Sequence, residues 1–147
     1  QTLDMVVAAL QPDVVMPEDQ QRLPEISGQQ EVFTGKFIDI TVNRGATGDI
    51  TIYEQPDGDR YIWFENFSAI KGPDLRVYLS TQNSTMLEDL EADEELGLSP
   101  DDIHLGRLDA NVGNQKFDIP RDADLTLFNS IIIFSQGLNL IYSMADF

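Results

Sequence analysis

Short runs of alternating apolar and polar residues fill most of the chain after residue 31. Ile50 and Ile52, for example, alternate with Thr51 and Tyr53, and a period of two indicates a half-buried β-strand. Short strands in close succession, with almost no long amphipathic helix, predict an all-β fold, an antiparallel sandwich or barrel. The strands expected on this basis span residues 33–42, 50–53, 61–64, 75–80, 103–108, 116–119, 125–128, 131–134 and 138–142.

The first 30 residues have a different pattern. Residues 5–10 could form one short helix, but Pro12, Pro17 and Pro24 prevent a regular element in the residues after it. We therefore divide the chain into a leader or linker, residues 1–30, and one β-domain, residues 31–147. The leader either packs along the domain, links it to something upstream, or is a partly ordered tail.

Residues 81–102 also interrupt the strand pattern, and they are strongly acidic. Between Glu88 and Asp102 there are eight carboxylates and no base, so this segment is either a solvated loop or a short acidic helix around residues 86–96. Four of its carboxylates occupy positions 1, 3, 5 and 12 of a possible calcium loop, although Leu96 stands where such a loop requires glycine. A solvated loop is the first expectation, and the candidate Ca²⁺ ligands are Glu91, Asp93, Glu95 and Asp102.

Composition narrows the chemistry further. The chain has 26 acids against 9 bases, a net charge of −17, which repels nucleic-acid phosphates and favours metal cations or a basic partner. It has no cysteine, which excludes disulfides, thiol catalysis and zinc–thiolate sites in this chain. His104 is the only histidine, and we expect it to be exposed on a strand; a mixed metal site there would need carboxylates from elsewhere.

No apolar run is long enough to span a bilayer. The chain begins at Gln1 and has no basic segment before residues 5–10. We therefore expect a processed chain whose targeting segment has been removed.

Two strings of residues carry a resemblance to a known family. They are Gly72-Pro73-Asp74-Leu75-Arg76-Val77-Tyr78-Leu79-Ser80 and Gly113-Asn114-Gln115-Lys116-Phe117-Asp118-Ile119-Pro120, and with weaker matches elsewhere the sequence resembles the DM13 domain over residues 33–147. The resemblance implies an extracytoplasmic antiparallel β-sandwich from a family proposed to act in electron transfer and often found beside haem-binding modules. It also implies a characteristic cysteine after the penultimate strand, where this chain has Ser135.

Serine cannot cycle between thiolate and oxidised sulfur, so the resemblance supports the fold but not thiol chemistry. The preferred interpretation is a non-enzymatic extracytoplasmic binding or accessory module without a cofactor, whose partner is a protein or small ligand. One alternative is a redox carrier that holds haem or another cofactor, in which His104 would be paired with Met5, Met16, Met86 or Met144. The other alternative is a Ca²⁺- or metal-dependent adhesion domain.

Three local expectations concern individual side chains. The turn Gly72-Pro73-Asp74 is interpreted as structural, with an unusual backbone conformation at Gly72 and with the Asp74 side chain bonded to backbone N–H groups. Ser135 is expected to be buried at a strand end with its hydroxyl bonded to backbone. Trp63 shares a strand face with Tyr61, and we expect it to be mostly buried with its indole N–H bonded.

Overall fold

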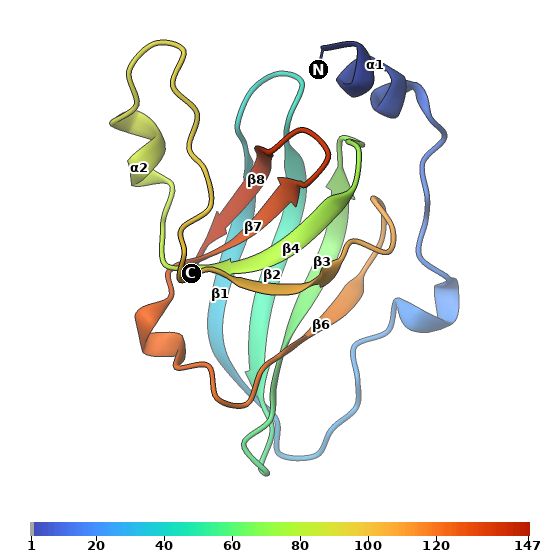
Figure 1. Ribbon diagram of the computed structural model, residues 1–147. Helices are drawn as coiled ribbons and strands as arrows, with labels where there is room; N and C mark the ends of the chain where they lie inside the picture. Colours follow the sequence, from blue (N-terminus) through green and yellow to red (C-terminus); the bar gives the residue numbers. More distant parts are fainter. Residues whose placement is uncertain (1) are drawn as a thin grey trace.

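The computed structural model describes residues 2–147 and contains one sheet of eight antiparallel strands (Figure 1). The order of strands across the sheet is β5-β4-β7-β8-β1-β2-β3-β6. The sheet curls until its two edges meet, and the ring of Phe117 on β6 packs beside Gly106 on β5. The strands are β1 (Gln30–Asp39), β2 (Ala46–Glu54), β3 (Arg60–Ala69), β4 (Leu75–Ser80), β5 (Ile103–Arg107), β6 (Gln115–Ile119), β7 (Ser130–Ser135) and β8 (Leu140–Asp146). The predicted all-β antiparallel fold is confirmed. Its eight strands form one nearly closed, barrel-like sheet.

Helices are short and lie outside the sheet. They are α1 (Thr2–Leu10), which includes the predicted short helix, α2 (Thr85–Glu88), and the 3₁₀ turns η1 (Glu18–Gln20) and η2 (Leu125–Leu127). Within residues 2–147, no helix combines the length and apolar character that crossing a membrane requires.

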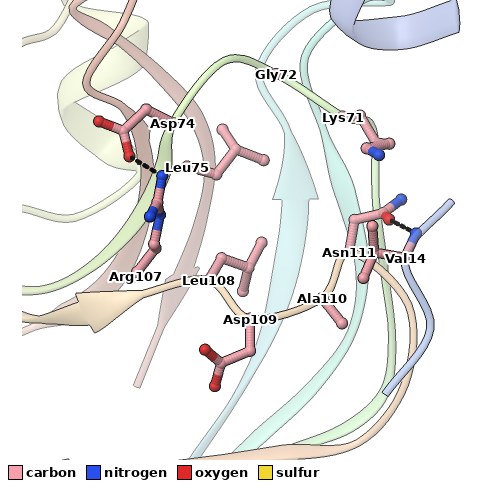
Figure 2. Close-up of a pocket in the computed structure, with 10 residues that line it drawn as sticks. All are labelled: Val14, Lys71, Gly72, Asp74, Leu75, Arg107, Leu108, Asp109, Ala110 and Asn111. Carbon is pink, nitrogen blue, oxygen red and sulfur yellow. Dashed lines mark hydrogen bonds and ion pairs between the residues drawn. The ribbon is translucent and has the colours of Figure 1, made fainter. Parts of the chain in front are cut away.

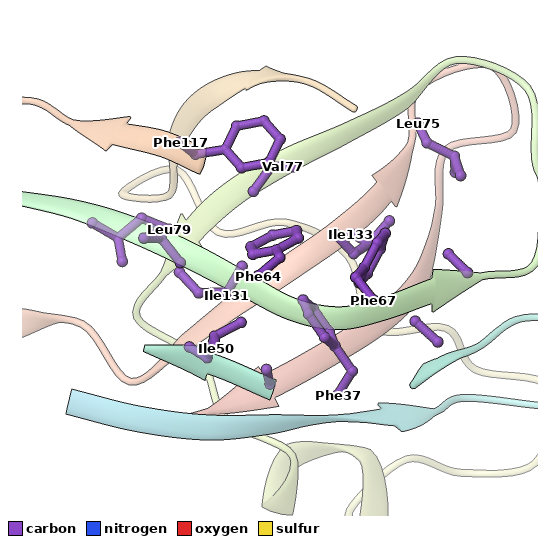
Figure 3. Close-up of a cluster of buried hydrophobic side chains, with 14 of the residues drawn as sticks. Phe37, Ile50, Phe64, Phe67, Leu75, Val77, Leu79, Phe117, Ile131 and Ile133 are labelled. Atoms are coloured by element: carbon purple, nitrogen blue, oxygen red, sulfur yellow. The ribbon is translucent and has the colours of Figure 1, made fainter. Parts of the chain in front are cut away.

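The main core lies inside the curled sheet, because alternate residues of every strand point inward. Four phenylalanines form its centre, with neighbouring ring centroids 5.0–5.1 Å apart, in the tilted and edge-to-face arrangements that aromatic rings prefer. Isoleucines, leucines and Val77 pack around these rings (Figure 3). The phenylalanines are Phe37, Phe64, Phe67 and Phe117.

Two segments outside the strands cover apolar patches on the outer face of the sheet. The leader covers Tyr53, Tyr61 and Trp63: Ile26 packs on these rings, and Tyr61 Oη donates to Gln29 Oε1 at 2.5 Å. The acidic segment covers Ile132, Phe134, Ile141 and Met144 with Leu96 and Leu98. The leader therefore lies along the domain, and the acidic segment is more than a solvated loop.

Three of the predicted strands were placed wrongly. The strand predicted over residues 33–42 is β1, which ends at Asp39, because Ile40 N and Thr41 N bond to Arg44 O in a turn. Residues 125–127 form η2 instead of a strand, because the Asp124 carboxylate accepts hydrogen bonds from Thr126 N at 3.0 Å and Thr126 Oγ1 at 2.6 Å and so closes a tight turn. The last strand begins at Leu140 rather than residue 138, because Asn139 adopts φ +57° in the turn that joins β7 to β8.

Candidate functional site

Ser135 is the last residue of β7 and is fully buried. Its Oγ donates to Pro73 O at 2.6 Å and accepts from Leu138 N at 3.2 Å. Both expectations for this residue, burial and a hydroxyl bonded to backbone, are confirmed. Ser135 therefore lies directly against the Gly72-Pro73-Asp74 turn, although Ser135 and Pro73 are 62 residues apart in the chain.

The turn itself is held by backbone contacts and by two arginines. Asp74 has φ +53° and its carbonyl accepts from Gln136 N at 2.9 Å. The Asp74 carboxylate accepts hydrogen bonds from Arg76 Nε at 2.8 Å and from Arg76 Nη2 at 3.2 Å. It also lies 3.7 Å from Arg107 Nη2. The expectation for this turn is thus corrected in two respects: the left-handed residue is Asp74 rather than Gly72, and guanidinium groups take the place of backbone N–H groups.

The hydrogen bonds from Arg76 lower the pKa of the Asp74 carboxyl, with a further contribution from the charges of Arg76 and Arg107. A lowered pKa means that these contacts favour the folded state above the carboxyl's unfolded pKa and are lost as the pH falls through the folded value. We expect the carboxyl carbon of Asp74 to titrate in NMR below the ordinary aspartate value of about 3.9. Arg76→Gln should raise this midpoint, and Arg107→Gln, whose guanidinium is farther away, should raise it less. An ordinary midpoint in the unmodified protein would contradict this prediction.

Gly72 is required by its contact with Tyr142, a fully buried residue of β8. A Cβ at residue 72 would lie 2.5 Å from Tyr142 Cζ and 2.7 Å from its Oη. The Oη has no hydrogen-bond partner in the described part of the chain. Burial raises the pKa of the Tyr142 hydroxyl, an effect that the charge of Arg44 opposes.

Gly72→Ala is therefore expected to destabilise the protein by about 1–3 kcal/mol, the usual cost of overpacking a core. Gly97→Ala is the matched control, because no atom lies within 4 Å of a Cβ built there; its effect should stay within about 0.5 kcal/mol. Denaturant unfolding of both variants measures the difference between their free energies of unfolding. Equal values would show that the Tyr142 ring shifts without cost to make room for a Cβ at residue 72.

A small pocket of about 170 Å³ opens beside this turn (Figure 2). Gly72, Asp74 and Leu75 line it from the turn and the start of β4, and Arg107 and Leu108 line it from the end of β5 and the residue after it. The leader closes a further side through Val14, whose N–H donates to Asn111 Oδ1 at 2.8 Å. The Asp74–Arg107 ion pair borders the pocket, whereas the Ser135 hydroxyl bonds the backbone of the turn instead of lining it.

The four candidate Ca²⁺ ligands are not brought together. Glu95 pairs with Arg44, at 3.1 Å between Arg44 Nη2 and Glu95 Oε1. Asp102 accepts from Ser80 Oγ, Thr81 N and Ser99 N at 2.8–3.1 Å. Glu91 and Asp93 are exposed. Across residues 2–147, no group of three aspartate, glutamate or histidine side chains is placed to hold a metal ion.

We accordingly expect millimolar CaCl₂ and NaCl of equal ionic strength to give the same melting temperature. Both salts screen the repulsion among the carboxylates of residues 88–102, whereas only a site specific to the folded state would add stability by mass action. A Ca²⁺-specific rise of several degrees, lost when Glu91, Asp93 and Glu95 become Gln or Asn, would contradict this prediction.

The histidine–methionine pairs that could ligate haem are also not assembled. His104 is exposed on β5, its ring 5.2 Å from that of Tyr78. Residues His104, Tyr78, Ile132 and Met144 stand opposite one another on four consecutive strands. At about 4.8 Å between strands, about 14 Å of sheet separates His104 from Met144, and Tyr78 and Ile132 stand between them on the same face, so the two side chains do not converge on one iron.

The other three methionines lie on separate elements. Met5 packs on the interior core from α1, Met16 is buried in the leader with its N–H bonded to Val112 O at 2.9 Å, and Met86 is exposed on α2. These residues do not fit a haem iron in this arrangement.

Three residues of the site region were not foreseen. Arg44 is 5% exposed, and besides Glu95 it bonds Ile141 O at 3.0 Å. Tyr142 and Arg107 complete the surroundings of the turn. Alternation could have indicated that Tyr142 points inward, but no local pattern marks Arg44 or Arg107, because their partners are distant in sequence.

The fold and these contacts define a class: an all-β barrel-like domain in which a Gly-Pro-Asp turn is bonded to the end of the penultimate strand. The family model described as electron transfer DM13 matches residues 36–147. The chain belongs to the DM13 family. Neither the curated proteins nor the solved structures contain a match to it.

Proposed function

We propose that this chain is a non-enzymatic, extracytoplasmic binding or accessory module of the DM13 family that operates without thiol redox chemistry. The observation that carries the proposal is the state of Ser135. The resemblance to the family implies a cysteine where Ser135 stands, and the donor and acceptor capacities of the Ser135 hydroxyl are both used by backbone groups. A serine held in this way ties the turn to the end of β7 and supplies no redox couple.

The chemistry of the remaining side chains supports the same proposal. A haem carrier needs axial ligands that converge, and His104 is remote from Met144 in the sheet. Nucleophilic catalysis by Ser135 would need an adjacent base, whereas its hydroxyl donates to a peptide carbonyl. The partner of such a module is a protein or a small ligand, and a surface of net charge −17 favours basic groups on a protein partner.

The test is redox and spectroscopic. Voltammetry of the purified protein should show no reversible couple in the biological range, and titration with haemin should give no saturable Soret change. A reversible couple, or a stoichiometric Soret band that is lost in His104→Ala, would overturn the proposal in favour of a redox carrier. Fractionation of cells that express the full-length gene tests the location, and recovery in the cytoplasm would overturn that part.

A further inference from the structure

Helix α1 presents an apolar side to solvent. Every residue from Met5 to Leu10 is apolar, and a helix that is apolar all round is normally buried all round. Here only one side of α1 is covered, because Met5 packs on the interior core and Ala8 is half-buried. The side chains at spacing i, i+3, i+4 and i+7 on the opposite side stay exposed. They form the α1 stripe: Leu3, Val6, Val7 and Leu10.

The exposed apolar side chains of the protein are concentrated in this segment. Twelve large apolar side chains are exposed in the described part of the chain, and six of them lie between Leu3 and Val15. Single exposed apolar residues are normal on a protein surface, whereas a contiguous group marks an interaction site. Leu3 and Leu10 are 72% and 79% exposed, so the two ends of the α1 stripe have the most area left to bury against a partner.

An acidic group borders the α1 stripe along one margin. Asp4 lies one helical turn before Val7 and is exposed. The first 21 residues of the chain contain four acids and no base. A cation that approaches this margin therefore meets an aspartate and no like charge from the same segment.

A hollow with two more aspartates borders the other margin. Ala9 of α1 lines this hollow of about 420 Å³ together with Asp13 and Asp39, between α1 and the turn that joins β1 to β2 (Figure 1). Both aspartates are exposed, and no lysine or arginine within residues 2–147 forms an ion pair with either. Lys71 also lines the hollow, but its Nζ donates to a backbone carbonyl of the leader at 2.5 Å. The α1 stripe therefore has carboxylates along both of its margins.

The apolar stripe and its acidic margins specify the chemistry of a partner. We propose that α1 docks an amphipathic α-helix of a partner protein, whose apolar face packs on the α1 stripe and whose lysine or arginine side chains pair with Asp4 and Asp39. A row of side chains along one side of a helix fits another helix, since packed helices interlock at axis separations of about 8–10 Å. A second copy of this chain, with the same charge of −17, and an anionic lipid surface are both repelled.

Docking at α1 is one form of the binding role proposed above and rests on it, but the surface includes neither Ser135 nor His104. A reversible redox couple would overturn the proposed function and leave binding at α1 unchanged. Absence of binding at α1 would overturn the docking surface and leave the voltammetry unchanged.

Fluorescence anisotropy of a labelled amphipathic peptide of leucine and lysine, titrated with the full chain, measures docking. We expect saturable binding. The same peptide with glutamate in place of lysine, and the same peptide with serine in place of leucine, should each bind at least about tenfold more weakly, a difference of about 1.4 kcal/mol. No saturable binding, or equal affinity for either control peptide, would overturn the proposal.

Two matched pairs of variants assign the surface. Leu10→Ser should weaken binding of the leucine–lysine peptide by about tenfold, and Asp39→Asn by about threefold, as expected for an exposed ion pair. Leu127→Ser and Asp122→Asn change another exposed leucine and aspartate, in and before η2 and away from α1 (Figure 1), and should leave the affinity unchanged. Equal losses within a pair, or an unchanged affinity in Leu10→Ser, would overturn the proposal.

Two further measurements distinguish other occupants of the α1 stripe. Sedimentation velocity of the chain alone should show a monomer, and flotation with phosphatidylcholine vesicles should leave the protein unbound. A dimer that is lost in Leu10→Ser, or vesicle binding that is lost in the same variant, would overturn the proposal, because a second copy or a lipid surface would then occupy the α1 stripe.

Discussion

Trp63→Ala is expected to lower the free energy of unfolding by about 3–5 kcal/mol, the range found for buried large aromatic residues. Trp63 is 2% exposed although it lies on the outer face of the sheet, because the leader covers it. It belongs to a cluster with the stacked rings of Tyr53 and Tyr61, whose centroids are 5.3 Å apart. Its indole Nε1 donates to Glu65 Oε2 at 2.5 Å, as the sequence predicted.

The variant should also loosen the leader. We expect faster amide hydrogen exchange at Met16 and Val112, which pair across the contact between leader and domain. Leu127→Ala is the control, because Leu127 is 63% exposed and its truncation should cost less than about 0.5 kcal/mol. A loss under about 1 kcal/mol for Trp63→Ala would show that the leader does not bury the indole in solution.

Ser135→Ala is expected to destabilise the protein by about 2–4 kcal/mol, because Pro73 O and Leu138 N both lose their partner and an unpaired buried group costs about 1–3 kcal/mol. Ser143→Ala is the matched control: Ser143 is equally buried, but its Oγ makes one hydrogen bond, to Ile38 O at 2.7 Å. The control should lose about half as much. Equal losses from the two serines would show that the second bond of Ser135, from Leu138 N, adds nothing.

Ser135→Cys extends this test to a thiol at the same position. A thiol at a fully buried position should react with a thiol reagent only after unfolding, because access controls cysteine reactivity. Rapid labelling of the folded variant would show that the turn opens readily and exposes the end of β7.

The alternation of apolar and polar residues along the sequence was enough to predict which faces of the strands are buried. The alternation of Ile50 and Ile52 with polar neighbours, and the isoleucines of β7, determine which face of each strand is buried, and Ser135 follows because it continues a wholly buried strand. The error at residues 125–128 was avoidable, since an aspartate two residues before a threonine is a turn signal.

The remaining features depend on contacts between distant segments. Nothing near Asp74 in sequence, apart from Arg76, shows that a second arginine 33 residues later completes its surroundings. Likewise, the acidic composition of residues 88–102 obscured the role of Leu96 and Leu98, which cover the outer face of the sheet. The closure of the barrel brings these distant residues into contact, so the residues next to each of them in the sequence do not indicate its partner.

The meeting of β5 and β6 also bears on self-association. An exposed strand edge offers unpaired N–H and C=O groups to a strand from another molecule, and proteins limit this hazard with short, covered or charged edges. Here both edge strands have five residues, they face each other, and Lys116 and Asp118 place charges along β6. Little of either strand edge is therefore free to pair with a strand from a second molecule. We expect concentrated solutions of this protein to resist cross-β aggregation while the barrel stays folded.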